Sequence, residues 1–294
     1  MNRIVVIGSV SMDLVVTTAK RPHAGETVIG QTFQTVPGGK GANQAVAAAR
    51  LGAQVEIVGC IGSDEFGQRI NQNFEQNGVG TSHLQTIDDE VTGTAHIVLA
   101  EGDNSIVVVQ SANKQVRFTE TELDQLLDEH TLVLLQLEIP METVEQVSAY
   151  CRSRNIPVLL NPAPSQALTD TLFENVTYVT PNEHECRDLF GDIPLEDLLR
   201  RYPNKLIVTE GVNGVRFFDG EMIQHIPAIS ANVVDTTGAG DTFNGALAVS
   251  LVEGNQLQEA ARFAVVASGL SVEGFGAQGG MPKRDDVTRR LERV

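Results

Sequence analysis

Short apolar runs that alternate with amphipathic segments are the feature that most constrains the fold of this chain. Each run has four to eight residues and is closed by Gly, Pro, Asn or an acidic residue. Continuous runs of this length are typical of strands that are buried on both faces of a parallel sheet. The clearest runs are RIVVIG (3–8), VEIVGCIG (55–62), TLVLLQLE (131–138), IPVLLNP (156–162), VTYVTP (176–181) and KLIVTEG (205–211).

The segments between the runs have apolar residues at helical spacing, and beyond residue 240 the pattern is almost entirely helical. Alternation of strands and helices predicts an α/β fold, with a doubly wound, mostly parallel sheet flanked by helices in one domain over residues 1–294. Thr119 with Glu122, and Thr180 with Glu183, match the capping-box pattern that starts a helix. Pro181 would then take the first position of the second of these helices. The clearest amphipathic segments are 41–52, 66–78, 119–130 and 141–155.

Two regions interrupt this alternation. Residues 13–36 and 92–110 consist of extended pieces separated by turn residues, and neither fits a crossover helix. They are expected to form either hairpins at the edge of the main sheet or a small separate sheet that covers a site.

Composition excludes several classes of partner. The 294 residues carry a formal net charge of −17, which argues against nucleic acid, because phosphate backbones recruit Lys and Arg. No apolar stretch is long enough to cross a membrane, and the start of the chain turns polar too soon for a signal peptide. The three widely spaced cysteines, without a CxxC pair, favour reduced thiols in the cytoplasm.

Polar residues follow the predicted strands at the point where each strand ends. In open α/β sheets, ligands bind outside the carboxyl ends of the strands, so these side chains should gather around one site. They are Ser11, Asp13, Glu138, Asn161, Asn182, Glu183, Glu185, Glu210, Asp235 and Asp241.

The stretch DTTGAGD (235–241) leads into a helix that should start near Gly240. Free N–H groups at a helix N-terminus, next to a Gly-Ala-Gly turn, make a binding site for an anion such as a phosphoryl group. Two roles are open for Asp241, which either takes a proton from an attacking hydroxyl or only stabilises the helix dipole.

A second glycine-rich stretch, VPGGKGANQ (36–44), also leads into a helix. It either brings backbone close to a ligand or is a tight loop. It is not a Walker A loop, because Gly41 follows Lys40 where Ser or Thr is required.

Together, GGKGANQAVAAARLG (38–52) and VVDTTGAGDTFNGAL (233–247) resemble the signatures of the ribokinase (PfkB-type) carbohydrate kinase family, and the similarity runs from Ile4 to Pro282. The resemblance implies a small β-sheet lid formed by residues 13–36 and 92–110. It implies transfer of phosphate from ATP to a sugar hydroxyl, the 5-hydroxyl of D-ribose in ribokinases. Magnesium, a monovalent cation such as potassium, and a homodimer formed through the lid sheets are implied as well.

The resemblance also assigns residues. Asp241 matches the catalytic base, and Gly238, Ala239 and Gly240 match the anion hole. The sugar site is matched by Ser11, Asp13, Gly39, Lys40, Gly41, Asn43 and Glu138. Magnesium and phosphate are matched to Asn182 and Glu185, and the nucleotide to Thr209, Glu210, Gly211, Val212, Asn213, Gly214, Gly240 and Val265. The potassium site is matched by Asp235, Thr237, Ser271, Gly274, Gly276 and Gly280.

Three positions depart from the family pattern. Ser11 stands where ribokinases usually carry Asn, which makes a 2-deoxypentose or another small sugar or nucleoside a second candidate substrate. Gly280 replaces a serine whose oxygen would contact the monovalent cation, and Val265 replaces a histidine near the adenine. A remote alternative is a sugar-binding protein without catalysis on the same fold.

Overall fold

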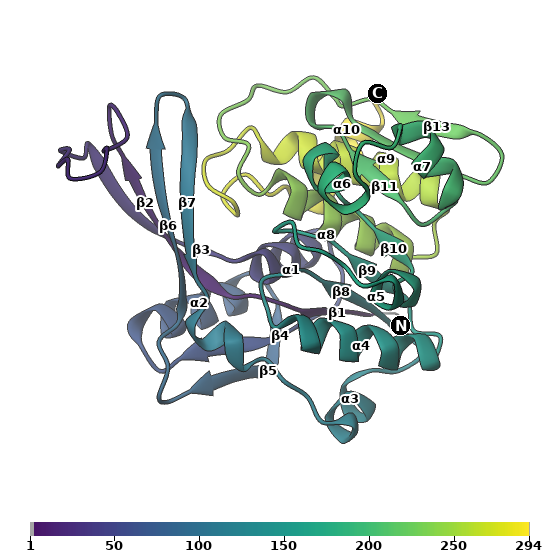
Figure 1. Cartoon of the computed structure of the whole chain (residues 1–294), viewed down its shortest axis with the longest axis horizontal. Coiled ribbons are helices and arrows are strands. Elements are labelled where there is room, and N and C mark those ends of the chain that lie inside the picture. Colours follow the sequence, from purple (N-terminus) through teal and green to yellow (C-terminus); the bar gives the residue numbers. More distant parts are fainter. Residues whose placement is uncertain (1–2, 294) are drawn as a thin grey trace.

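A parallel sheet of six strands forms the centre of the chain in the computed structural model, which describes residues 3–293 (Figure 1). The strand order is β10-β9-β8-β1-β4-β5, and every neighbouring pair is parallel. The strands are β1 (Arg3–Ile7), β4 (Val55–Gly62), β5 (Gly80–Ile87), β8 (Thr131–Leu135), β9 (Val158–Leu160) and β10 (Tyr178–Val179).

Three further strands continue from the β10 edge. Single parallel bridges join Val179 to Leu206 and Asn182 to Thr209, and from there β11 forms an antiparallel sheet with β12 and β13. The strands are β11 (Ile207–Thr209), β12 (Val215–Phe218) and β13 (Ile223–Ile226). The apolar runs predicted β11 but not β5, β12 or β13, because these three strands have partly exposed faces and lack continuous apolar runs.

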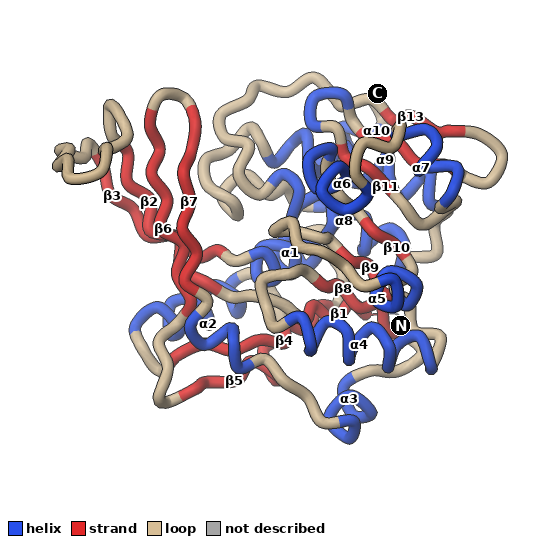
Figure 2. Tube along the Cα trace, in the orientation of Figure 1, coloured by secondary structure: helices blue, strands red, loops and turns tan. Residues whose placement is uncertain are grey.

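Helices cover both faces of the main sheet (Figure 2). Alternate residues of β1 enter opposite cores, since Ile4 and Val6 pack with α1, α8 and α9, whereas Val5 and Ile7 pack with α3, α4 and α5. The predicted doubly wound α/β class is therefore confirmed. The helices are α1 (Lys40–Arg50), α2 (Glu65–Gln76), α3 (Glu120–Leu126), α4 (Met141–Ser153), α5 (Asp170–Asn175), α6 (Glu183–Phe190), α7 (Leu195–Arg201), α8 (Ala239–Val252), α9 (Leu257–Ser271) and α10 (Arg284–Leu291), with short 3₁₀ helices at η1 (Ser111–Gln115) and η2 (Gly211–Asn213).

The two irregular regions of the sequence form a separate four-stranded sheet, which extends away from the main sheet in Figure 2. Its order is β3-β2-β6-β7, with β2 antiparallel to β3 and parallel to β6, and with β6 antiparallel to β7. The expectation of a small separate sheet is thus confirmed over that of edge hairpins. The strands are β2 (Ser11–Thr17), β3 (Thr32–Gly38), β6 (Gly93–Ala100) and β7 (Asp103–Val109).

One of the two predicted capping boxes is present and the other is wrong. The box of Thr119 and Glu122 starts α3 as expected. The second box belongs to Asn182 and Glu185 instead, and α6 begins after Asn182.

The hydroxyl of Thr180 is not free to cap α6. It is buried and donates to Oδ1 of Asn244 at 2.5 Å, because residue 180 still belongs to the sheet edge that contacts α8. Pro181 therefore lies before the helix and not at its first position.

Helices α1 and α8 approach closely at Gly245. A Cβ placed there would lie 2.8 Å from the Cβ of Ala47 and 2.8 Å from the carbonyl oxygen of Gln44. This close approach brings the first turns of both helices together at the carboxyl edge of the sheet.

We expect Gly245→Ala to lower the free energy of unfolding by about 1–2 kcal/mol, because the added methyl group separates α1 from α8. Chemical denaturation measures the change. Helix propensity alone would raise the free energy of unfolding by up to about 1 kcal/mol. Such an increase would contradict the close approach of α1 and α8.

Candidate active site

A cavity of about 130 Å³ lies where the carboxyl edge of the main sheet meets the small sheet. It brings together residues that are far apart in the chain, and most of the predicted sugar-site residues are among them. The lining residues are Ser9, Ser11, Asp13, Gly39, Lys40, Asn43, Ala95, Ile97, Ile106, Val108, Gln110, Asn113, Glu138, Thr237, Gly238, Asp241 and Ala277.

Glycines in the loop before α1 allow this convergence. Gly39 is the N-cap of α1 with φ of 91°, and a Cβ there would lie 2.8 Å from the backbone nitrogen of Ser11. Gly41, which the family resemblance matches to the sugar site, does not line the cavity. Its Cα packs on Gly8 and Ser9, where a Cβ would lie 2.7 Å from backbone atoms, so its role is to let α1 approach the end of β1.

Carboxylates crowd around a single lysine in this cavity. Burial, Glu138 and Asp241 raise the pKa of Asp13 to about 7, although Lys40 opposes them. Burial lowers the pKa of the Lys40 ammonium, but the surrounding carboxylates outweigh this effect and raise it. Lys40 is therefore charged, whereas Asp13 is partly protonated near neutral pH.

Glu138, just beyond β8, is held by groups from three segments. Its Oε2 accepts a hydrogen bond from the hydroxyl of Ser9 at 2.5 Å and one from the backbone N–H of Lys40 at 3.2 Å. Its carbonyl oxygen accepts from the side chain of Gln110 at 3.1 Å. Glu138 thus joins the ends of β1, β7 and β8 and the start of α1 on one side of the cavity.

Asp241 lies in the first turn of α8 and is only 7% exposed. Its Oδ2 accepts from the side-chain amide of Asn43 at 2.9 Å, and its Oδ1 accepts from that of Gln44 at 3.0 Å. Burial raises the pKa of Asp241, while Lys40 and the two amides favour the ionised form. The arrangement gives a desolvated carboxylate that faces a polar cavity.

The start of α8 also presents backbone donors. Gly238 is its N-cap in a left-handed conformation with φ of 78°, and the N–H of Ala239 donates to the carbonyl of Thr236 at 3.2 Å. Within residues 3–293, the N–H groups of Gly240 and Asp241 have no hydrogen-bond partner. A Cβ on Gly240 would meet no atom within 4 Å, so the start of α8 is open on the side of Gly240, and unpaired N–H groups at a helix N-terminus are suited to binding an anion.

Asn182 and Glu185 occupy the first turn of α6. Oδ1 of Asn182 accepts from the backbone N–H groups of His184 and Glu185, and Oε2 of Glu185 accepts from the N–H of Asn182 at 2.9 Å. Glu185 is 9% exposed, and burial raises its pKa while the N–H of Asn182 and the Lys40 ammonium oppose that effect. Within the described residues, Oε1 of Glu185 has no hydrogen-bond partner and is not among the buried unpaired atoms, so it is available to a ligand.

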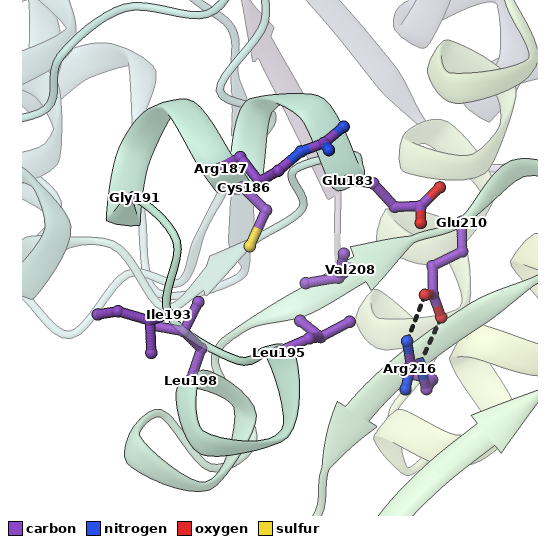
Figure 3. Close-up of a pocket in the computed structure, with 10 residues that line it drawn as sticks. All are labelled: Glu183, Cys186, Arg187, Gly191, Ile193, Leu195, Leu198, Val208, Glu210 and Arg216. Carbon is purple, nitrogen blue, oxygen red and sulfur yellow. Dashed lines mark hydrogen bonds and ion pairs between the residues drawn. The ribbon is translucent and has the colours of Figure 1, made fainter.

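The predicted nucleotide segment 209–214 runs from β11 through η2. Val212 at its tip is 90% exposed, but the side chain of Glu210 is buried and forms two hydrogen bonds of 2.5 Å with the guanidinium of Arg216. Figure 3 shows this pair at the edge of a different cavity, of about 250 Å³, between α6, α7 and β11. The side chain of Glu210 is therefore occupied by Arg216, and this residue can contact a nucleotide only through its backbone. Val265 is 7% exposed and packs in the apolar core, so little of its side chain is accessible.

The residues matched to a monovalent cation come together from the loop before α8, the last residue of α9 and the loop that follows α9. The carboxylate of Asp235 accepts from the backbone N–H groups of Thr237 and Gly276, each at 2.9 Å. Although burial raises the pKa of Asp235, these hydrogen bonds keep it below its usual value. Gly280 is pressed against Gly274 and Ser271, and a Cβ at position 280 would overlap the carbonyl oxygen of Ser271.

Sequence reasoning missed several residues of this site. Ser9 follows a predicted strand just as Ser11 does, so the same signal was available for it. Gln110 and Asn113 lie beyond β7, and no pattern in the sequence places the end of that strand beside the main sheet. Gln44 was assigned only to an amphipathic helix. In the described part of the chain, no group of three or more His, Cys, Asp or Glu side chains could hold a metal ion.

This chain belongs to the pfkB family of carbohydrate kinases, whose model matches residues 1–284. It is 54% identical to ribokinase from Bacillus subtilis over 99% of this chain and 100% of that protein, and 49% identical to ribokinase from Lactococcus lactis over 100% and 98%. The structure of Arabidopsis thaliana ribokinase complexed with ribose and ATP matches with a TM-score of 0.90 at 33% identity, over 99% of both chains.

The raised pKa of Asp13 predicts a pH-dependent stability. A carboxyl group that has a higher pKa in the folded state stabilises the fold at low pH, and this stabilisation is lost as the pH rises from about 4 through 7. Asp13→Asn removes this pH dependence. The free energy of unfolding of the variant minus that of the wild type should therefore be about 2 kcal/mol larger at pH 8 than at pH 5. Denaturant titrations at the two pH values measure this difference, and an equal effect of the substitution at both would show that Asp13 is ionised throughout.

Proposed function

We propose that this chain is a ribose kinase that transfers the γ-phosphate of ATP to the 5-hydroxyl of D-ribose. The observation that carries the proposal is a buried carboxylate, Asp241, that faces a polar, sugar-sized cavity beside free N–H groups at the start of α8. Full-length relatives that are ribokinases, and a matching fold known with ribose and ATP, support this substrate pair.

The side chains of the cavity account for sugar binding and proton transfer. Asp13, Asn43 and Glu138 supply acceptors and donors for the sugar hydroxyls, while Ile106 and Val108 of the small sheet cover the sugar. Asp241 accepts the proton of the 5-hydroxyl as that oxygen attacks the γ-phosphorus. The bond from phosphorus to the leaving oxygen of ADP breaks, and the N–H groups of Gly240 and Asp241 stabilise the charge on the transferring group.

We assign magnesium to the region of Asn182 and Glu185. The free Oε1 of Glu185 suits a water molecule in the shell of an ion that is mostly bound by phosphate oxygens, which is how magnesium usually binds nucleotides. Magnesium would neutralise charge on the ATP phosphates. Lys40, which lies among carboxylates that include Glu185 and Asp241, places one fixed positive charge between the two sites.

We assign a monovalent cation to the loops around Asp235. These loops lie close together and Asp235 is ionised, which fits a cation bound mainly by carbonyl oxygens. Such a cation would add positive charge near the start of α8. Gly280 cannot be replaced by the serine usual in this family without displacing the carbonyl of Ser271, so the carbonyl groups and Asp235 would provide the protein ligands.

We further propose that the small sheet is a lid and that it joins two chains into a homodimer. Strand β7 exposes Ile106, Val107, Val108 and Val109 by 45% to 65%, which is unusual for four consecutive apolar residues unless they are covered.

A cytoplasmic location is consistent with three free, buried cysteines. No described helix is long and apolar enough to cross a membrane.

Asp241→Asn should reduce kcat by about 10²- to 10⁴-fold, because the amide cannot accept the hydroxyl proton. A coupled assay for ADP release measures kcat at saturating ribose and ATP. The matched variant Asp64→Asn alters a carboxylate that caps α2 and should keep kcat near that of the wild type. Near-normal turnover by a folded Asp241→Asn protein would rule out this base.

Ser11→Asn should favour ribose further over 2-deoxyribose, because a longer amide reaches a second sugar hydroxyl. The measurement is kcat/KM for both sugars and for a panel of pentoses and nucleosides, with and without potassium. Wild-type preference for 2-deoxyribose would identify the second candidate substrate. Tight sugar binding without turnover of ATP by the wild type would instead support the non-catalytic alternative.

Sedimentation should give twice the mass of one chain at micromolar concentration, because pairing of two lids removes the apolar surface of β7 from water. Replacing Val107 and Val109 together by Lys should lower the mass to that of one chain. A wild-type protein with the mass of one chain at all concentrations would contradict the proposed dimer.

A further inference from the structure

Asp241 receives hydrogen bonds from amides that are themselves held by other amides. On one side, Nε2 of Gln136 donates to Oε1 of Gln44 at 2.7 Å, and Nε2 of Gln44 donates to Oδ1 of Asp241 at 3.0 Å. Gln44 also donates to Oδ1 of Asn161 at 3.1 Å, and its side chain is completely buried. We call this series of hydrogen bonds, from Gln136 through Gln44 to Asp241, the inner chain.

A second series reaches the other carboxylate oxygen. The side-chain nitrogen of Asn73 donates to Gln278 at 2.8 Å, Gln278 donates to Asn43 at 3.0 Å, and Asn43 donates to Oδ2 of Asp241 at 2.9 Å. This outer chain begins on α2. Both chains therefore donate in the same sense, toward the carboxylate, and consecutive hydrogen bonds aligned in this way strengthen one another in a buried environment.

The direction of the inner chain has a cost, and an ionised acceptor at Asp241 explains why it is tolerated. A carboxylate only accepts hydrogen bonds, so Gln44 must turn its NH₂ group toward Asp241 and its oxygen toward Gln136. Oε1 of Gln136 is then left buried without a partner, the one such side-chain atom in residues 3–293. Gly8 gives this oxygen its space, because a Cβ at Gly8 would overlap it. An orphaned acceptor destabilises the fold, so packing stability alone does not account for the arrangement.

We propose that Gln44 is a positioning residue for the proton acceptor, and that it holds Oδ1 of Asp241 ionised and oriented so that the remaining lone pairs of the carboxylate face the sugar cavity. The proposal rests on the catalytic role proposed for Asp241. Gln44 does not line the cavity, unlike Asn43, so it acts on the reaction through Asp241 and not through the sugar.

The charged groups around Asp241 make such support necessary. Lys40 at the start of α1 favours the ionised form, but Glu138 beyond β8 opposes it. Glu185 on α6, and Asp13 on β2 when it is ionised, also oppose it. Burial is the largest effect and also disfavours the ionised form. The amide hydrogen bonds compensate for part of this effect.

Gln44→Leu tests the proposal, because leucine has a similar volume and no donor. The acidic limb of the pH profile of kcat should move to higher pH by about one unit, since the ionised form of Asp241 loses a hydrogen bond. The KM for ribose should change less than about threefold. Gln136→Leu should move the limb in the same direction by a smaller amount, because it weakens the inner chain one residue further from Asp241.

Val46→Ala is the matched control, because it removes buried apolar volume from the same helix without changing either series of hydrogen bonds to Asp241. It should lower the thermal stability and leave the acidic limb in place. A folded Gln44→Leu enzyme whose acidic limb coincides with that of the wild type would overturn the proposal.

A second readout does not depend on turnover. A ¹³C NMR titration of the aspartate carboxyl groups in the unliganded chain, assigned with Asp241→Asn, should give a higher pKa for Asp241 in Gln44→Leu than in the wild type. An unchanged pKa would count against Gln44 even if the enzyme is active. If the wild type transfers no phosphate to any sugar, the proposed function fails, and this titration alone decides the role of Gln44.

Discussion

A carboxylate buried between the first turns of α1 and α8 is the constraint on which the rest of the site depends. Removing Asp241 from water disfavours its charge, and the fold compensates with two amide donors, the nearby Lys40 ammonium and the start of a helix. These groups reach Asp241 only because α1 and α8 approach as closely as Gly245 allows.

The parallel sheet supplies the other half of the arrangement. Its strands end at one edge, so Ser9 after β1 and Glu138 after β8 become neighbours although they are 129 residues apart in sequence. The small sheet then adds Asp13 and an apolar cover from β7 above this edge. A polar floor with an apolar cover suits a small polyhydroxylated ligand that must be shielded from water during phosphoryl transfer.

The sequence predicted those parts of the molecule that depend on interactions between residues close in sequence. Runs such as 55–62 are apolar throughout because both faces of a central parallel strand are buried, and that signal located most of the main sheet. Strand β5 escaped detection because its residues are largely exposed. The capping box was placed two residues early because Thr180 and Asn182 both satisfy the local pattern, and only the contact of Thr180 with Asn244 on α8 decides between them.

The site itself was predictable where residues follow strands or belong to a family motif, as Asp13 and Asp241 do. Gln44 and Gln136 were not, because a buried glutamine is meaningful only through the partner that faces it, and that partner comes from another segment. The position of Glu210 beyond β11 suggests a ligand contact, but its carboxylate is hydrogen-bonded to Arg216, and no pattern in the sequence shows that pair.

The proposed mechanism requires Asp241 to accept the proton of the attacking sugar hydroxyl. The most direct measurement is a crystal structure with ribose and a non-hydrolysable ATP analogue, which gives the position of the sugar relative to this carboxylate. We predict that one oxygen of Asp241 lies within about 2.6–3.2 Å of the 5-hydroxyl oxygen, with the γ-phosphoryl group on the far side of that oxygen and near the N–H groups of Gly240 and Asp241. A bound ribose whose 5-hydroxyl points away from Asp241, toward another base or solvent, would contradict it.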